Sequence, residues 1–172
     1  MYSENSIETA NRSISMSLIN NKLLTATLAT ACSGLCAGAL SFLSFVDVRS
    51  FLHHIANKKA DVVVAHFQVW SSNACEFMVP LIASNIISHA TAYFFTQDPL
   101  WIATGAILGL IGPYTTVFLG EDIEKLRCCS SKQEVDSTVK RFCTLHHMRL
   151  IMATAGFGMS LFGMGKQFER SS

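Results

Sequence analysis

The chain has 172 residues, of which 50% are hydrophobic and only 15% are charged. A soluble domain carries about 25% charged residues, so the composition argues against a soluble core and favours a single membrane-embedded domain. With a formal net charge of +1 and no basic stripe, we expect no nucleic-acid partner.

The charged residues gather in clusters separated by long apolar stretches, which is the pattern of a membrane protein. The 6 cysteines contain no C-x-x-C pair, so they predict neither a disulfide framework nor a zinc site. Cysteines within the apolar stretches are expected to act as small hydrophobic residues.

The first predicted membrane helix covers residues 23–45 and follows a Ser- and Asn-rich segment, residues 1–21, that we expect to be a flexible tail. This charge-free run exceeds the roughly 20 residues that cross the hydrocarbon core of a bilayer. Gly34 and Gly38 have the spacing that lets two helices approach closely. A signal peptide cleaved near residues 37–39 is the alternative, but the apolar run is longer than a typical signal peptide requires.

A polar connection follows over residues 47–61, where apolar side chains at helical spacing predict a short interfacial helix. The second span, residues 63–95, begins amphipathic and becomes apolar. His66, Asn73 and Glu76 lie roughly on one face of this helix.

Pro80 lies in the middle of the second span and is expected to kink it or to end one half of it. His89 and Asn85, one helical turn apart in the same span, are expected to form an interhelical hydrogen bond. A turn at residues 97–99 leads into a third predicted span, residues 100–119, in which Gly105 and Gly109 have the close-packing spacing. A partly helical charged segment follows over residues 121–141. A fourth span over residues 142–164 and a C-terminal tail over residues 166–172 complete the chain.

These elements predict an all-α integral membrane four-helix bundle whose transmembrane domain covers residues 22–165. Lys and Arg are more numerous in the loops after the first and third spans, so we place those loops in the cytoplasm and both termini outside or in a lumen. We expect a multi-pass protein of the endoplasmic reticulum or plasma membrane. The glycine-spaced faces would also allow a homo-oligomer.

Polar residues at the ends of the spans meet on the loop-rich side of such a bundle, which predicts a pocket there. They are Asp47, Arg49, His66, Asn73, Glu76, Thr115, Thr116, Glu121, Asp122, His146, His147 and Arg149. His146 and Arg149 share a helix face, where a histidine can act as a base and an arginine can stabilise an oxyanion. A structural ion pair of Glu76 with Arg149 or Arg49 is the alternative to a functional role for Glu76.

Pro113 stands near the polar end of the third span and is followed by Tyr114, Thr115 and Thr116. A proline inside a membrane helix frees backbone carbonyls, and neighbouring hydroxyls commonly satisfy them. The same break can leave hydroxyls facing the pocket, and the two roles are compatible.

Two motifs therefore stand out: Pro113-Tyr114-Thr115, and the His146-x-x-Arg149 pair. Together with the glycine-rich residues 33–48 and the start of the second span, residues 66–81, they resemble the anthrone oxygenase family, small four-helix membrane proteins. The resemblance covers about residues 23–164. The chain departs from the family in two places, since Phe142 stands where a tryptophan is usual and no asparagine lies near Ile123.

The resemblance implies a monooxygenase that needs no cofactor and no metal, and that oxidises an anthrone-like polycyclic phenol of the polyketide type to a quinone with O2. It implies His146 as the base and Arg149 as the partner of the enolate, with Tyr114 or Thr115 donating a hydrogen bond and Glu76 orienting His146 or pairing with Arg149. Further substrate-binding candidates are His66, Trp70, Asn73 and Phe142. The expected partners are the lipid bilayer, a planar lipophilic small molecule and O2.

Two other functions remain open at the level of sequence. A haem-binding membrane redox protein could take axial ligands from His66, His89, His146 or His147. A non-enzymatic membrane scaffold would use the glycine spacings and polar ends for packing and partner choice alone. If the His146→Ala and Arg149→Ala variants keep their function, the chain is a scaffold and not an enzyme that uses these residues.

Overall fold

The structure, a computed structural model, describes residues 4–128 and 132–171, and within them the chain is helical apart from short turns and contains no strand. Its elements are α1 (Glu4–Phe42), the π-helical η1 (Leu43–Val48), α2 (Arg49–Ala56), α3 (Ala60–Thr96), α4 (Leu100–Gly109), α5 (Ile111–Tyr114), the π-helical η2 (Thr115–Leu119), α6 (Gly120–Cys128) and α7 (Lys132–Ser171). The all-helical fold class is therefore confirmed.

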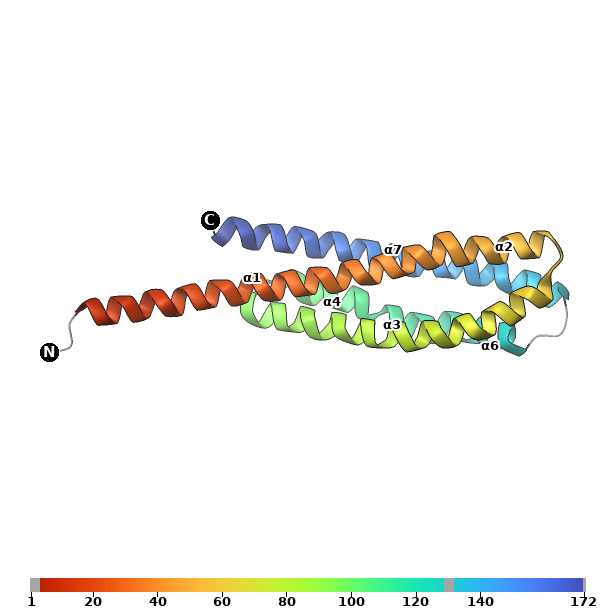
Figure 1. Cartoon of the computed structure of the whole chain (residues 1–172), viewed down its shortest axis with the longest axis horizontal. Coiled ribbons are helices and arrows are strands. Elements are labelled where there is room, and N and C mark those ends of the chain that lie inside the picture. The colour runs from red at the N-terminus through yellow and green to blue at the C-terminus, as the bar shows by residue number, and fades with distance from the viewer. Residues whose placement is uncertain (1–3, 129–131, 172) are drawn as a thin grey trace.

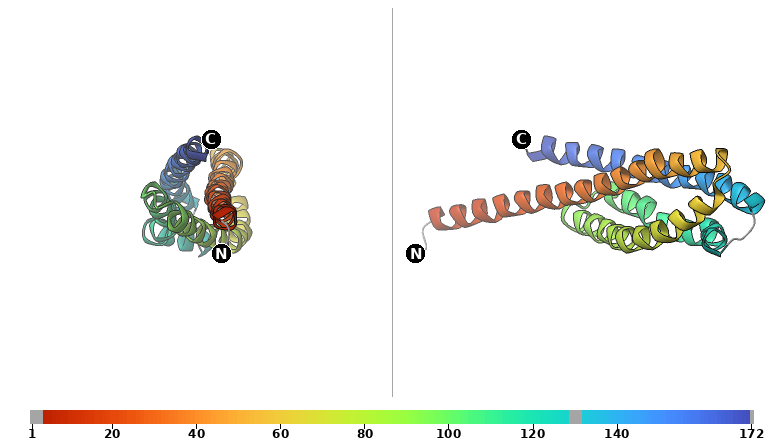
Figure 2. Two further views of the ribbon diagram at one scale, coloured as in Figure 1. Left: turned by 90° about the vertical axis from the view of Figure 1, so that its left-hand side faces the viewer. Right: turned by 45° about the vertical axis from the view of Figure 1, so that its right-hand side comes forward.

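The helices lie side by side along one long axis (Figure 1). The chain passes without interruption from α1 through η1 into α2. It also passes from α4 through α5 and η2 into α6, with only the turn residue Leu110 between α4 and α5. Helix α1 packs against α7 and α3, and α4 packs against α3 and α7, so that the helical runs enclose a common interior (Figure 2).

Both predicted tails are helical where they are described. Helix α1 begins at Glu4, so the described part of residues 1–21, for which a flexible tail is expected, is helical. Extending an existing helix adds one hydrogen bond per residue without a new nucleation step, which allows polar residues to continue it. Helix α7 likewise continues through the segment expected as a C-terminal tail and runs to Ser171. Residues 1–3 and 172 lie outside the described ranges.

An ion pair fastens the C-terminal turns of α7 to the turn between α3 and α4. Lys166 Nζ donates to Asp98 Oδ2 over 2.8 Å, and Asp98 Oδ1 accepts a hydrogen bond from the backbone N–H of Leu100. Gln97 has a left-handed φ of 56°, which ends α3 at the predicted turn. The hydrogen bond from Lys166 lowers the pKa of the Asp98 carboxyl from its usual value.

The helical interpretation of the charged connections is confirmed. Helix α2 occupies the segment after the first span and buries Phe51. Helices α6 and α7 occupy the charged segment of residues 121–141, apart from residues 129–131, which lie outside the described ranges. Pro80 does not end α3, which continues through it as one curved helix (Figure 2).

Three helical stretches of the described chain are long and apolar enough to cross a membrane: Met16–Ala56, Ala60–Thr96 and Leu100–Cys128. They contain the first three predicted spans. The fourth predicted span, within α7, is not among them, because Arg149, two histidines and several near-neutral glycines lower its mean hydropathy.

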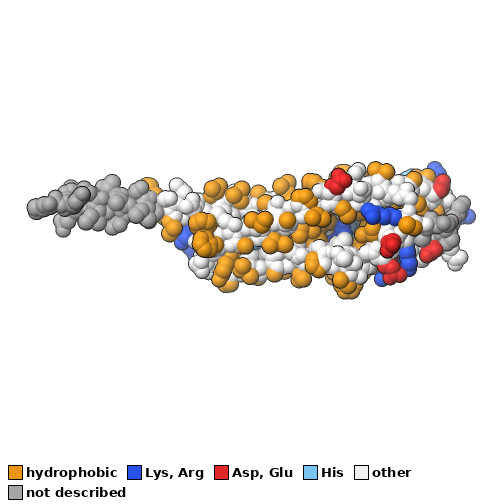
Figure 3. Space-filling view, turned by 90° about the horizontal axis from the view of Figure 1, so that it is seen from below, with side chains coloured by type: hydrophobic (Ala, Val, Ile, Leu, Met, Phe, Trp, Pro, Cys, Tyr) orange, Lys and Arg blue, Asp and Glu red, His pale blue; other side chains and the backbone are white. Residues whose placement is uncertain are grey.

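The outer surface along the middle of the molecule is largely apolar, whereas acidic and basic side chains gather towards the end that carries α2 and α6 (Figure 3). Large outward-facing side chains on the long helices include Leu35, Phe77, Ile87, Phe94, Val117, Ile151 and Phe162. A soluble monomer rarely exposes contiguous apolar surface on this scale, so the surface requires an apolar partner.

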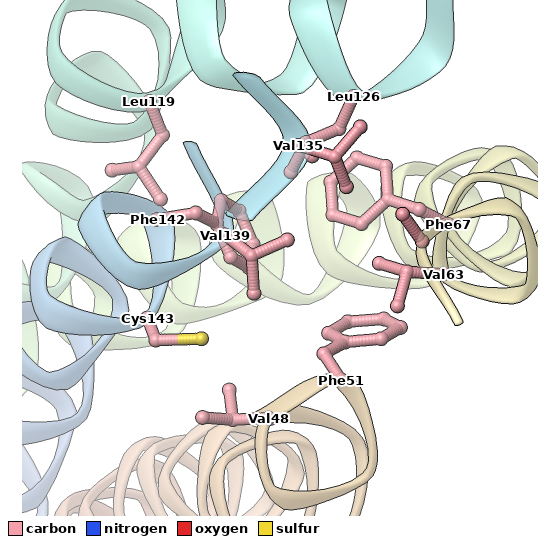
Figure 4. Packing of buried hydrophobic residues seen from close by; sticks show 11 residues of the cluster. Val48, Phe51, Val63, Phe67, Leu119, Leu126, Val135, Val139, Phe142 and Cys143 are labelled. Atoms are coloured by element: carbon pink, nitrogen blue, oxygen red, sulfur yellow. The ribbon is translucent and has the colours of Figure 1, made fainter. Parts of the chain in front are cut away.

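The core nearest the charged loops is built around aromatic rings from α2, α3 and α7 (Figure 4). Phe67 and Phe142 meet edge to face with ring centroids 5.2 Å apart, and Phe51 packs against Phe67 at 5.7 Å. Such a pair contributes about 0.5–1.5 kcal/mol beyond its buried area. This cluster holds the start of α7 against α3, next to the site described below.

Glycines permit the closest helix approaches. A Cβ atom on Gly105 would lie 2.9 Å from His89 Cβ, and one on Gly34 would lie 3.0 Å from the Phe157 ring. A Cβ on Gly109 would meet Ile86 at 3.3 Å. These three glycines therefore lie where two helices of the same chain are in close contact. Gly38, in contrast, has open space beside it.

Candidate functional site

Arg149 of α7 is buried, with 7% of its surface exposed. Its Nη1 donates to Thr115 Oγ1 over 3.2 Å, and its Nη2 donates to His146 Nδ1 over 3.0 Å, while its buried Nε has no hydrogen-bond partner. None of the ion pairs among the described residues involves Arg149. The guanidinium remains charged in proteins, so the site holds a buried positive charge that no carboxylate neutralises.

Thr115 is the first residue of η2 and links this π-helical turn to α7. Its hydroxyl donates to the Ile111 carbonyl at 2.6 Å, so its oxygen accepts the bond from Arg149. Thr116 donates in the same manner to the Gly112 carbonyl at 3.3 Å. The hydroxyls after Pro113 therefore bond to backbone carbonyls one turn earlier, those of Ile111 and Gly112, and not to the Gly109 carbonyl, which is the one that loses its helical N–H partner to Pro113. Thr115 also faces the buried arginine. π-Helical turns of this kind are frequent at functional sites.

His146 is fully buried and lies parallel to the ring of Phe142, with centroids 6.0 Å apart. An arginine N–H can only donate, so Nδ1 of His146 is the acceptor and lacks a proton. The neutral ring then carries its proton on Nε2, which is buried near the Leu40 carbonyl without a hydrogen bond of good geometry. The His146 side chain therefore accepts a hydrogen bond from Arg149 and fixes the position of its guanidinium.

A cavity of about 230 Å³ lies in front of Arg149, between α3 and the α5–η2–α6 run. It is lined by Trp70, Ser71, Ala74, Cys75, Met78, Val79, Ile82, Ile111, Gly112, Thr115, Thr116, Ile123 and Arg149. Met78, Ile111 and Arg149 are buried and form its floor, whereas Cys75 and Thr116 are exposed at its rim. The cavity is therefore a mostly apolar slot with one cationic side chain in its lining, and it opens to the surface where Cys75 and Thr116 are exposed.

Trp70 borders the cavity and is held in place from η1. Its Nε1 donates to Asp47 Oδ2 over 2.8 Å, so that Asp47 positions an aromatic wall of the slot. Arg49, two residues after Asp47, places its guanidinium over the Phe45 ring at 5.7 Å and does not line the cavity.

The structure brings together only part of the predicted site. Trp70, Thr115 and Arg149 line the cavity, and His146 contacts Arg149 directly. Phe142 lies behind His146. Tyr114 turns towards α7, where its hydroxyl donates to the Leu145 carbonyl at 3.3 Å.

His66, Asn73 and Glu76 are exposed and do not line this cavity. His66 packs against the edge of the Phe51 ring at 5.1 Å. Glu76 forms no ion pair with Arg149 among the described residues. The reason is geometric, because Glu76 is two residues from the inward-facing Met78 and therefore points to nearly the opposite side of α3.

Several lining residues were missed at the level of sequence, above all Ser71, Cys75, Met78 and Ile82. They follow one another along α3 at steps of four, three and four residues, the spacing of one helix face. That spacing was available in the sequence. It did not distinguish this face because α3 is apolar on several sides.

His89 belongs to a separate buried hydrogen-bond network. Its Nδ1 donates to the Asn85 carbonyl at 2.8 Å, and its Nε2 lies 3.0 Å from Ser160 Oγ and 3.2 Å from Ser33 Oγ. The bonds to Ser33 and Ser160 join three helices, whereas the bond to Asn85 is within α3. Both ring nitrogens are engaged, so haem ligation by His89 would require breaking this network.

No group of three or more His, Cys, Asp or Glu side chains in the described part of the chain is arranged to hold a metal ion. The chain was also compared with protein-family models, curated proteins and solved structures, and none of them matches. The function is therefore argued from the site itself.

Proposed function

We propose that this chain is a multi-pass integral membrane protein in which α1, α3, the α4–α6 run and α7 form a transmembrane four-helix bundle. The outward-facing leucines, valines and phenylalanines of the long helices support this placement, because lipid is the partner that suits an apolar belt around a helical protein. Helix α7 crosses despite Arg149, since that side chain faces the interior. The endoplasmic reticulum or plasma membrane is the proposed location.

Membrane insertion is tested by extraction of cell membranes. The full chain should stay in the pellet after alkaline carbonate and be released by detergent. Release by carbonate alone would overturn the placement. Cysteine or glycosylation tags in the α2–α3 and α6–α7 connections should report the cytoplasmic side, as the distribution of Lys and Arg predicts.

The cavity in front of Arg149 is proposed to bind a flat, lipophilic molecule with an enolate or phenolate oxygen. The observation that carries the proposal is the buried guanidinium without a carboxylate partner. Of the five N–H donors of a guanidinium, the bonds to Thr115 and His146 use one on each terminal nitrogen, which leaves the second N–H of Nη1 and of Nη2 for a ligand. An apolar slot gives such a charge a strong preference for an anionic oxygen.

The proposed reaction is the cofactor-independent oxidation of an anthrone-like substrate to a quinone. Loss of a proton from the methylene carbon gives an enolate, whose oxygen Arg149 would stabilise. The enolate passes electrons to O2, a carbon–oxygen bond forms to give a hydroperoxide, and loss of water leaves the new carbonyl. The balance is one anthrone and one O2 to one quinone and one water.

His146 has a conditional role in this proposal. Its Nδ1 is occupied by Arg149 and its Nε2 carries the proton, so in the observed arrangement it is a positioning residue. If Arg149 turns its Nη2 to the enolate, Nδ1 becomes free to accept a proton. The base function expected from the resemblance therefore depends on a movement of Arg149.

The test is O2 uptake and quinone formation by the detergent-solubilised protein with an anthrone. Arg149→Gln should lower kcat/KM by about 100-fold, corresponding to about 2.7 kcal/mol of transition-state stabilisation. Glu124→Gln, on the exposed face of α6, is the matched control and should retain wild-type activity. Absence of uptake above the uncatalysed rate by folded wild-type protein would overturn the oxygenase proposal.

A further inference from the structure

Cys75 is the cysteine that borders the cavity. It lies on α3 at the exposed rim of the slot, whereas Cys36 and Cys143 are buried and Cys32 is half-buried. Cys128 is exposed but does not line the cavity. Among the described cysteines, Cys75 therefore combines access from outside with a place in the proposed ligand site.

A second, independent feature of the same cavity points to a carbonyl ligand. Arg149 lines the slot, is 7% exposed, and uses only one N–H of each terminal nitrogen in its bonds to Thr115 and His146. A ligand oxygen in the slot could accept a hydrogen bond from the guanidinium. The cavity thus places a sulfur nucleophile at its rim and an unneutralised hydrogen-bond donor at its floor.

We propose that Cys75 is a covalent modification site for lipophilic α,β-unsaturated carbonyl compounds, the class that includes quinones. The sulfur adds to the β-carbon, so that an S–C bond forms while the π bond between the α- and β-carbons breaks. The displaced electron pair moves to the carbonyl oxygen, where the guanidinium of Arg149 stabilises it, and the thiol proton ends on the α-carbon. The addition needs neither an oxidant nor a reductant.

The surroundings of Cys75 determine which electrophiles can reach its sulfur. The exposed rim residues Cys75, Val79 and Thr116 lie on α3 and η2, both within helices long and apolar enough to cross a membrane. A neutral compound dissolved in the bilayer can reach this rim, whereas a charged one cannot. The inference therefore rests on the proposed membrane insertion and ligand cavity, and it is independent of the oxygenase reaction. An adduct at Cys75 would fill the slot and block it.

The test uses the full chain in lipid vesicles, with Cys128 and Cys129 replaced by serine. The probes are neutral N-phenylmaleimide and a maleimide that carries a sulfonate, and mass spectrometry follows the rate of adduct formation. The matched control is Cys75→Ala combined with Ala83→Cys, which moves the thiol along α3 to another exposed position outside the slot. Arg149→Gln in the Cys75 background removes the charge.

Cys75 should react with N-phenylmaleimide at least about tenfold faster than the thiol at position 83, a difference of about 1.4 kcal/mol. Arg149→Gln should remove most of that advantage. Equal rates at the two positions with Arg149 intact would overturn the inference, whether or not the Arg149 variant folds. Equally fast reaction of Cys75 with the sulfonated maleimide would also overturn it, because the rim would then lie in water. Neither of these two results would bear on O2 uptake by the wild-type chain.

Discussion

Arg149 donates a hydrogen bond from Nη2 to Nδ1 of His146, one helical turn earlier on α7, over 3.0 Å. This bond assigns the two residues different roles. The arginine faces the cavity, while the histidine, buried against Phe142, determines where the guanidinium lies. In the sequence, the His-x-x-Arg pair suggests that both side chains face the ligand. In the structure, Arg149 lines the cavity and His146 contacts Arg149 instead of the cavity.

His146→Phe should destabilise the protein more than His146→Asn. An asparagine side chain can place its amide oxygen near the position of Nδ1 and keep the bond to Arg149, whereas phenylalanine leaves a buried N–H without an acceptor. The expected difference is about 1–3 kcal/mol in the free energy of unfolding. Thermal unfolding in detergent measures it, and equal melting temperatures for the two variants would contradict the assigned tautomer.

Thr115→Val should raise KM for the anthrone about tenfold, or about 1.4 kcal/mol, while Thr115→Ser should stay near wild type. Valine has nearly the shape of threonine but removes the acceptor for Arg149 Nη1 and the donor to the Ile111 carbonyl. Serine keeps the oxygen. Steady-state O2 uptake gives KM for both variants. A Ser variant as impaired as the Val variant would show that shape, and not the hydroxyl, matters at this position.

Gly105→Ala should destabilise the contact between α3 and α4 by about 1–3 kcal/mol. The added methyl would lie 2.9 Å from His89 Cβ, an atom at the root of its side chain that no rotamer change can move away. Gly158→Ala is the control within a helix, because nothing lies within 4 Å of its added Cβ. Alanine there should be neutral or stabilising by up to about 1 kcal/mol. Melting temperatures of the two variants show whether the loss of stability comes from the close contact with His89 or from replacing any helical glycine. A similar change in both variants would contradict the packing explanation.

Asp98→Asn should lower stability at neutral pH, by about 1 kcal/mol, because it removes the charged partner of Lys166. The hydrogen bond from Lys166 lowers the pKa of Asp98 in the folded protein. The stabilisation is therefore complete above the unfolded pKa of about 3.9 and is lost as the pH falls through the lower folded value. Melting temperatures of wild type and Asp98→Asn should converge over that acidic range. A gap that stays constant with pH would contradict the ion pair as its cause.

The sequence by itself determined the helical class, the three long apolar helical stretches and the turn before Pro99. It also indicated that the hydroxyls after Pro113 can bond to backbone carbonyls, although not to which carbonyls. These features depend on local chemistry: long charge-free runs, a ring that lacks an N–H, and a break between apolar stretches. Local information also placed His146 and Arg149 on one face of α7.

Only the tertiary structure decided which face of each helix turns inward. Helix α3 is apolar on several sides, so its sequence carries little periodic signal to separate Met78, which faces the cavity, from Glu76, which does not. The pairing of Thr115 with Arg149 joins residues far apart in the chain. It exists because η2 packs against α7, and the relative rotation of two packed helices is set by the side chains of both.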